Sequence, residues 1–288
     1  MNPDWIIEVL NKNAKRGDFR FAVFDFDGTI SLIRQGWKDV MKTYFLEELS
    51  RVAGADETNE ELIECIGDFV DYNTGRQTIY QCISLCDEIK KRGGHPEEPL
   101  FYKNEYHNRL LSKINYRLDG LRNGGLKGEE WVVPGSYKFL EALRKRGLKL
   151  YLASGTDEKY VVDEARLLNV DGYFEGIYGA QDDYKNYSKK IVIQRIVSEN
   201  NLRGPELIGF GDGYVEIENI RESGGFTVGV ASDELNRSGM DEWKHKRLSK
   251  AGADILIPDF SESDVLLGYL FDPEIEFDPK VEVDTDAV

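Results

Sequence analysis

Cysteine and histidine are both scarce in this sequence. Of three cysteines among 288 residues, Cys82 and Cys86 lie one helical turn apart and the third is distant, which matches no metal-binding spacing. We therefore expect reduced, packed thiols, since free cysteine behaves mainly as a small apolar side chain. We expect structural or solvent-exposed roles for the three histidines, which lie near none of the motifs described below: His95, His107 and His245.

Long hydrophobic runs are also missing. Apolar stretches such as residues 148–153 and 265–271 fall far short of the ~18 residues that a membrane-spanning helix needs. The apolar stretch near the N-terminus contains Asp4 and Glu8, unlike a secretory signal. The sequence therefore favours a cytoplasmic protein without a membrane partner.

Basic residues are outnumbered by acidic ones. The chain has 37 lysines and arginines against 53 aspartates and glutamates, a net charge of −16 at pH 7. Such a chain repels the backbone of nucleic acids and anionic lipids, so we expect no nucleic-acid partner. A phosphorylated metabolite would be repelled as well, and a site for one would need a local cation, either a metal ion or a lysine.

Strands and helices are expected to alternate along much of the chain. Residues 19–26 form a short apolar run that ends in a turn, which predicts a buried strand. Further strands are expected at 148–153, 173–178, 207–210, 226–230 and 254–257, and helices at 136–146, 157–168, 189–200, 214–223 and 243–249. This alternation predicts an α/β fold, a Rossmann-like parallel sheet covered by helices on both faces.

Residues between the first strand and Val133 have a different pattern. Segments 37–52, 59–70, 78–91 and 102–118 have helical periodicity and no clear strand. We predict a second, all-helical domain at 33–125, inserted into a core of residues 1–32 and 126–270. The glycine-rich segment 123–128 fits either a hinge or a plain flexible loop. Residues 271–288 are acidic without helical period, and we expect a tail there.

Polar groups follow three of the expected strands at the point where each strand ends. The carboxyl ends of parallel strands share one edge of a sheet, and ligands collect there. We therefore expect these groups to converge, together with two lysines at the start of a helix. They are Asp25-Phe26-Asp27-Gly28-Thr29, Ser154-Gly155-Thr156, Gly211-Asp212-Gly213 with Glu216, and Lys189 with Lys190.

In this order the groups resemble the four motifs of the haloacid dehalogenase superfamily. The resemblance covers roughly residues 19–32 and 130–232. The helical insertion resembles the cap domain of that superfamily's small-molecule phosphatases and phosphomutases. The resemblance implies a phosphatase that hydrolyses a small phosphorylated metabolite, such as a sugar phosphate or a nucleotide, beneath a mobile cap. The sequence leaves monomer and homodimer equally open.

The resemblance assigns roles to the acidic residues. Asp25 would attack phosphorus and become an aspartyl-phosphate, while Asp27 would protonate the leaving oxygen and later deprotonate water. An anionic nucleophile approaching an anionic phosphate needs charge neutralisation, which Mg²⁺ supplies. The implied metal ligands are the side chains of Asp25 and Asp212 and the backbone carbonyl of Asp27, with Glu216 in a supporting outer role.

The phosphate oxygens need hydrogen-bond donors. We assign this role to Thr29, Ser154, the Gly155 amide and Lys189. Lys190 is the alternative to Lys189, because neighbouring residues on a helix point about a hundred degrees apart and the sequence does not fix the phase.

Other residues near the motifs allow two interpretations. Thr156 and Asp157 could simply cap a helix. Arg34 and Arg76 lie at the entrance of the insertion and in its 74–76 turn, where they could meet the substrate, or they could be surface charges.

Two other functions compete with the phosphatase. A phosphomutase shares all four motifs and returns the phosphoryl group to the substrate rather than to water. A non-catalytic binding protein could keep the same fold, but it would not need a nucleophile and an acid together.

Overall fold

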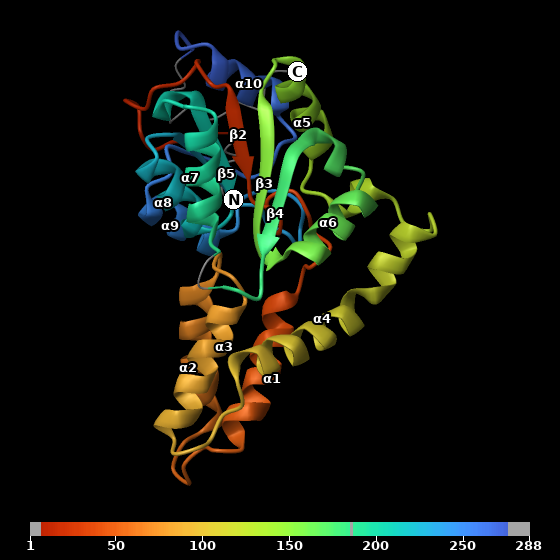
Figure 1. Cartoon of the computed structure of the whole chain (residues 1–288), viewed down its shortest axis with the longest axis vertical. Coiled ribbons are helices and arrows are strands. Elements are labelled where there is room, and N and C mark those ends of the chain that lie inside the picture. Colours follow the sequence, from red (N-terminus) through yellow and green to blue (C-terminus); the bar gives the residue numbers. More distant parts are fainter. Residues whose placement is uncertain (1–6, 185–186, 276–288) are drawn as a thin grey trace, which may run out of the picture.

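The computed structural model describes residues 7–184 and 187–275 and contains a seven-stranded sheet in the order β1-β7-β6-β5-β2-β3-β4. Six strands are parallel to their neighbours, and β1 pairs antiparallel with β7. The predicted parallel α/β fold is therefore confirmed (Figure 1). The strands are β1 (Glu8–Val9), β2 (Phe21–Phe24), β3 (Lys149–Asp157), β4 (Phe174–Ala180), β5 (Leu207–Gly211), β6 (Phe226–Val230) and β7 (Ile255–Ile257).

Helices cover both faces of the sheet, and the side chains of β2 show why. Phe21 and Val23 pack with residues of α7 in one apolar cluster, whereas Ala22 and Phe24 join a second cluster that includes Phe139 of α5. Successive side chains of a strand point to opposite faces, so a strand that is apolar throughout requires cover on both. The helices of this part are α5 (Ser136–Lys145), α6 (Glu158–Leu167), α7 (Lys189–Glu199), α8 (Tyr214–Glu222), α9 (Glu242–Ala251) and α10 (Ser263–Phe271).

Two of these elements were not predicted. Strand β1 has two residues, too few to show alternation. Helix α10 is apolar along most of its length and therefore carries little helical periodicity. It ends at Phe271, and of the predicted tail only residues 271–275 lie within the described part of the chain.

The inserted segment is helical, as predicted, and lies where the parallel strands end (Figure 1). Its helices share an apolar interior with side chains such as Tyr44, Phe45, Leu62 and Ile114. The placement of the domain boundaries at 33 and 125 stays a prediction. The helices are α1 (Trp37–Ser50), α2 (Asn59–Asn73), α3 (Ile79–Lys91) and α4 (Pro99–Arg122). In the described parts of the chain, no helix is both long enough and apolar enough to cross a bilayer.

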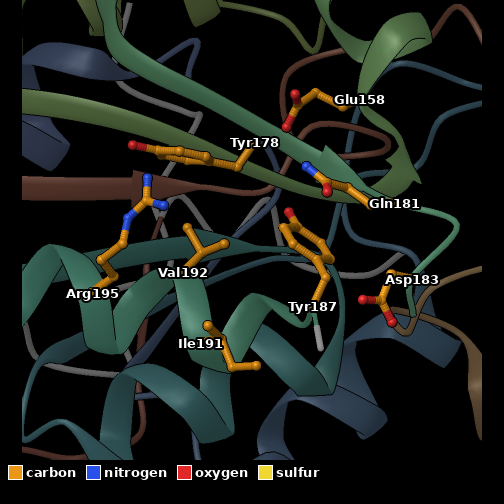
Figure 2. Close-up of a pocket in the computed structure, with 8 residues that line it drawn as sticks. All are labelled: Glu158, Tyr178, Gln181, Asp183, Tyr187, Ile191, Val192 and Arg195. Atoms are coloured by element: carbon orange, nitrogen blue, oxygen red, sulfur yellow. The ribbon is translucent and has the colours of Figure 1, made fainter. Parts of the chain in front are cut away.

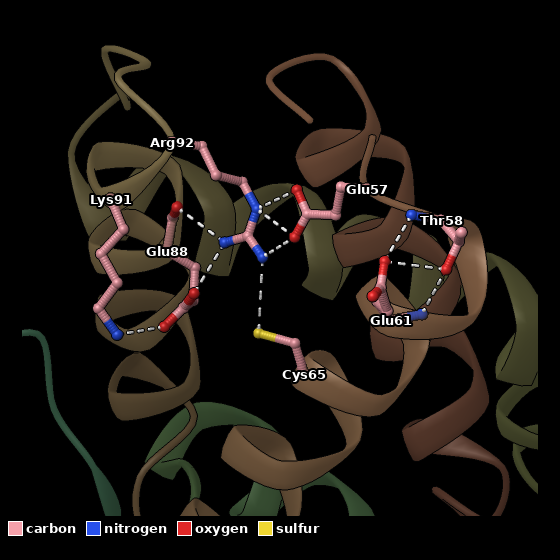
Figure 3. Close-up of polar contacts among 7 residues, drawn as sticks. All are labelled: Glu57, Thr58, Glu61, Cys65, Glu88, Lys91 and Arg92. Atoms are coloured by element: carbon pink, nitrogen blue, oxygen red, sulfur yellow. Dashed lines mark hydrogen bonds and ion pairs between the residues drawn. The ribbon is translucent and has the colours of Figure 1, made fainter. Parts of the chain in front are cut away.

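Ion pairs fasten the outer end of the insertion (Figure 3). The guanidinium of Arg92, after α3, donates to both carboxylate oxygens of Glu57 and to Glu88. A capping box between Thr58 and Glu61 starts α2 next to this pair. Cys65 lies beside Arg92 as a free thiol. These contacts define the ends of α2 and α3.

All three cysteines are free, as predicted, and Cys82 and Cys86 are buried. Burial raises the pKa of the Cys82 thiol above its ordinary value. A protonated thiol in an apolar interior is a poor nucleophile and metal ligand. These cysteines therefore act as packing residues.

His107 joins the insertion to the core, since its ring stacks on Tyr160 of α6 with 3.8 Å between ring centroids. Burial, together with the nearby charges of Arg34, Lys159 and Lys103, lowers the pKa of His107 from 6.5 to about 3. Below pH 6.5 this histidine therefore becomes protonated in the unfolded chain but stays neutral in the folded chain. As a result, the free energy of unfolding decreases as the pH falls below 6.5, whereas above pH 6.5 this histidine does not change it.

We expect His107→Phe, which keeps the ring and removes the titration, to flatten this pH dependence. Between pH 6.5 and 5, the unfolding free energy of wild type should fall relative to the variant by about 1 kcal/mol per pH unit or less, because the ring is only partly buried. Urea denaturation at pH 7, 6 and 5 measures the difference, with exposed His95→Gln as control. Equal pH slopes for wild type and His107→Phe would contradict the assignment.

Candidate active site

Asp25 directly follows the central strand β2 and is buried. Its backbone amide donates to the Phe210 carbonyl of β5 at 2.9 Å, which extends the sheet pairing by one residue. One carboxylate oxygen, Oδ1, accepts a hydrogen bond from the Phe26 amide at 2.7 Å and lies 2.9 Å from Nζ of Lys189. The carboxylate is thus fixed by two donors at the carboxyl end of the sheet.

Asp27 is held by the residues that follow β3. Thr156 Oγ1 donates to Asp27 Oδ2 at 2.8 Å, and Ser154 Oγ lies 3.4 Å from the same oxygen. Burial raises the pKa of Asp27, although Arg34 and the Thr156 hydroxyl act in the opposite direction. A carboxyl that keeps its proton more readily suits an acid–base role.

Lys189 is the first residue of α7, which begins after an N-cap at Ser188. Its ammonium lies between Asp25 and Glu216 and contacts both carboxylates. Burial alone would lower the pKa of Lys189, but these two carboxylates outweigh it and raise that pKa. Lys190 instead pairs with Glu222 at the surface, its side chain about half exposed. The structure therefore brings Lys189, and not Lys190, to Asp25.

Glu216 and Asp212 are two further acidic residues whose charges act on Asp25. Glu216 is buried, and one oxygen contacts Lys189 while no hydrogen-bond partner for Oε2 is found within the described residues. Asp212, after β5, lies 2.9 Å through Oδ2 from Nζ of Lys244. Burial and then the charge of Glu216 raise the pKa of Asp25, Lys189 lowers it, and Asp212 raises it further. Three of the expected acidic residues thus act on one another electrostatically.

The carboxylates outnumber the cations around Asp25. Five carboxylates against two ammonium groups and the Arg247 guanidinium, whose charge acts on Asp212 and Glu216, leave two negative charges uncompensated when all are ionised. Arg34 and Glu164 add a pair without net charge. The carboxylates are Asp25, Asp27, Asp212, Glu216 and Glu234, and the ammonium groups are Lys189 and Lys244.

This donor set suits a hard cation, because it offers oxygen ligands and excess negative charge. In the described ranges, no group of three or more His, Cys, Asp or Glu side chains is arranged to hold a metal ion. The implied ligand set has only two carboxylate side chains, Asp25 and Asp212, beside a backbone carbonyl, and so would not form such a group. The unpartnered Oε2 of Glu216 marks a further position next to Asp25 where a positive charge would be stabilised.

Arg34 is not the surface charge that was one of its two interpretations, and its contact with the substrate stays a prediction. It is buried and forms a two-pronged ion pair with Glu164 of α6, with Nη2 to Oε1 at 2.7 Å. Its Nε also lies 3.9 Å from Asp27 Oδ1. Glu164 was missed because, on an amphipathic helix, a glutamate predicts an exposed side chain.

Thr156 and Asp157 do more than cap a helix. Asp157 occupies the N-cap position of α6, as the capping interpretation predicts, but its side chain makes no capping hydrogen bond, and strand β3 continues through it. Thr156 binds Asp27, while Asp157 lies 2.6 Å from the buried ammonium of Lys103 on α4. Nothing in its helical sequence context marked Lys103 as an interior residue.

The 74–77 segment of the insertion lies against the glycines of two motifs. A Cβ atom on Gly155 would lie 2.6 Å from the Arg76 carbonyl oxygen, and one on Gly75 would lie 3.5 Å from Gly213. The Arg76 side chain itself is exposed and packs near the rings of Tyr72 and Tyr80. The backbone of this segment, rather than the Arg76 guanidinium, thus covers the predicted phosphate position at Gly155.

Core residues hold that segment in place. Arg247 of α9 donates to the carbonyl oxygens of Tyr72 and Thr74, each at 3.2 Å. Gln77 Nε2 donates to the Tyr187 carbonyl before α7 at 2.7 Å. The insertion is therefore docked on the edge of the sheet that carries the motifs.

Thr29 lies in the turn after Asp27 and is fully buried. Within the part of the chain that the structure covers, its hydroxyl has no hydrogen-bond partner. Burying an unpaired hydroxyl is costly unless a ligand or water completes it. The role of the Thr29 hydroxyl as a phosphate donor stays a prediction.

A cavity of about 220 Å³ lies between β4 and α7, and Figure 2 shows the side chains that line it. The Arg195 guanidinium lies 4.8 Å from the ring of Tyr178 at one end. No residue of the four motifs lines the cavity, so it is separate from the site. Its lining residues are Glu158, Tyr178, Gln181, Asp183, Tyr187, Ile191, Val192 and Arg195.

Comparisons with known proteins agree with the motifs. A family model of haloacid dehalogenase-like hydrolases matches residues 19–224. A 5'-nucleotidase of Pseudomonas aeruginosa is 27% identical over 122 residues, which are 42% of this chain and 55% of that protein, so the match spans about half of the relative's length.

Solved structures of low sequence identity share the fold. A predicted phosphoglycolate phosphatase from Haemophilus somnus (15% identity, TM-score 0.57) covers 87% of this chain and 98% of its own. β-Phosphoglucomutase from Clostridium difficile (17%, TM-score 0.57) covers 87% and 97%. A HAD family hydrolase from Deinococcus radiodurans, solved with bound phosphate and sodium (15%, TM-score 0.54), covers 88% and 97%.

Proposed function

Because the chain belongs to the haloacid dehalogenase-like hydrolases, we propose that it is a phosphatase that hydrolyses a small phosphate monoester through an aspartyl-phosphate. One observation carries the proposal: at the end of the central strand, the buried carboxylate of Asp25 contacts the Lys189 ammonium, which also contacts Glu216, and the charge of Asp212 acts on Asp25 as well. A nucleophile, an acid and a phosphate-binding cation are thus gathered in one place. A protein that only binds a ligand would not need this combination.

In the first step, a carboxylate oxygen of Asp25 attacks phosphorus, and the bond between phosphorus and the leaving oxygen breaks. Asp27 gives its proton to that oxygen, and the alcohol product departs. In the second step, Asp27 takes a proton from a water molecule that attacks the phosphorus of the aspartyl-phosphate. Inorganic phosphate leaves, and both carboxyl groups return to their starting states.

Mg²⁺ would be held by the side chains of Asp25 and Asp212 and the Asp27 carbonyl, with Glu216 nearby. When bound, it supplies the positive charge that lets an anionic nucleophile approach an anionic phosphate. The excess of negative charge around Asp25 and the oxygen-only donor set support this assignment.

The phosphate itself would be bound by Lys189, the hydroxyls of Ser154 and Thr29, and the Gly155 amide. These donors stabilise the charge on the transferring phosphoryl group. The Deinococcus radiodurans relative, solved with phosphate and a cation, supports a phosphate site on this fold. Cover by the 74–77 segment would keep bulk water away during transfer.

The test is phosphate release from a generic aryl phosphate. We expect activity with added Mg²⁺, loss of activity with a chelator, and recovery when Mg²⁺ is restored. Activity that survives complete chelation would remove the metal from the proposal. A panel of phosphorylated metabolites, including sugar phosphates and nucleotides, then identifies the substrate.

A phosphomutase is the second candidate, because a β-phosphoglucomutase shares the fold with a TM-score of 0.57. A mutase would interconvert sugar phosphate isomers and hold a long-lived aspartyl-phosphate. A phosphatase would release phosphate quickly. Incubation with sugar monophosphates, followed by separation of the isomers, distinguishes the two.

A further inference from the structure

Lys244 lies next to Asp212 but belongs to none of the four motifs. It is on α9, and only 8% of its surface is exposed. Its ammonium meets Asp212 Oδ2 at 2.9 Å, Glu234 Oε1 at 2.8 Å and Ser232 Oγ at 3.1 Å. An ammonium has three donors, so every one of them has a partner. The group is therefore held in one position rather than left free to move.

The partners of Lys244 connect it to the turn at Gly28, shortly after the nucleophile Asp25. Ser232, which follows β6, donates through Oγ to the Gly28 carbonyl at 2.6 Å. The backbone carbonyl of Glu234 accepts a hydrogen bond from Gln35 at 2.8 Å, at the start of the insertion. A Cβ on Gly28 would lie 2.2 Å from Asp212 Oδ2, so the carboxylate packs directly on that turn. Lys244 thus joins the ends of β2, β5 and β6.

The charges explain why a lysine is tolerated beside a cation site. The ammonium of Lys244 has two carboxylates within 3 Å, Asp212 and Glu234, so its buried charge is paired. Glu234 offsets that charge, so the Lys244–Glu234 pair adds no net charge near Asp212. Electrostatic opposition to a divalent ion is then small, and the orienting hydrogen bond to Asp212 dominates.

We propose that Lys244 is a positioning residue for the metal ligand Asp212. By holding Oδ2, the ammonium fixes the rotation of the carboxylate and leaves Oδ1 for the divalent cation. A carboxylate that is already oriented loses less conformational freedom when the ion binds. Outer partners that orient metal ligands in this way typically contribute 10- to 100-fold in metal affinity. The inference rests on the proposed metal dependence.

The test is direct binding of Mn²⁺ to the phosphate-free protein, followed by electron paramagnetic resonance of the free ion. We expect Lys244→Met to weaken Mn²⁺ binding about 10- to 100-fold. Lys244→Arg, which keeps the charge and the donors, should remain closer to wild type. Exposed Lys246→Met, on the same helix, is the matched control and should bind as wild type does.

Folding and the metal proposal are controlled separately. If Lys244→Met does not fold, Ser232→Ala is measured in the same way, because it removes one hydrogen-bond partner of Lys244 without leaving a buried charge unpaired. Ser232→Ala should weaken Mn²⁺ binding. Unchanged Mn²⁺ binding by this variant would overturn the positioning role of Lys244. Binding by Lys244→Met that equals or exceeds that of wild type would also overturn it. If wild type itself binds no Mn²⁺, the metal proposal fails and the role of Lys244 fails with it.

Discussion

Asp25→Asn is expected to lower the rate of phosphate release by roughly 10⁴-fold or more, the scale seen when a catalytic nucleophile is removed. A neutral amide has no anionic oxygen to attack phosphorus, so no aspartyl-phosphate forms. The substitution keeps the shape of the side chain and an acceptor for the Phe26 amide and Lys189. It also removes one negative charge from a site in which Glu216 and Asp212 repel the charge of Asp25. We therefore expect the variant to fold with undiminished stability.

Steady-state kinetics and thermal unfolding of the same preparation separate the two effects. Asp264→Asn, at an exposed ion pair with Lys138, is a control that should leave the rate unchanged. Loss of activity with an unchanged melting temperature assigns the effect to chemistry. A variant that keeps the wild-type rate would exclude Asp25 as the nucleophile.

Lys189→Met should lower both activity and stability. We expect a fall in rate of roughly 10²- to 10³-fold, since the variant lacks a charge aimed at the phosphoryl oxygens. It also leaves Asp25 and Glu216 buried without their shared cation. Breaking a buried ion pair from one side typically costs about 3–5 kcal/mol. Bound Mg²⁺ should restore part of that loss.

Lys190→Met is the matched control, because the two lysines are adjacent and differ in environment. Lys190 pairs with Glu222 at the surface, and such pairs contribute about 1 kcal/mol or less. Lys190→Met should release phosphate at the wild-type rate. Kinetics and urea denaturation of both variants test the assignment, and similar behaviour of the two would refute it.

The fold could be predicted because its signals are local. Alternating apolar strands and amphipathic helices indicate a parallel sheet, and the structure has one. Elements with weak local signals, such as the two-residue β1, were missed. The grouping of the motifs was equally predictable, since β2, β3 and β5 are neighbours whose carboxyl ends share one edge.

Pairings between distant side chains were not predictable in the same way. Arg34 meets Glu164 across 130 positions of sequence, and Lys244 meets Asp212 from a helix that resembles any charged surface helix. No local pattern records such a partner, because the contact depends on how whole elements pack.

By itself, then, the sequence determined the sheet, the helical insertion and the edge at which Asp25, Asp27 and Asp212 gather. Only the tertiary structure decided which of two adjacent lysines turns inward and which charges neutralise one another. Backbone periodicity fixes elements over a few residues, whereas the burial of a charge depends on a counter-charge that packing brings from elsewhere in the chain.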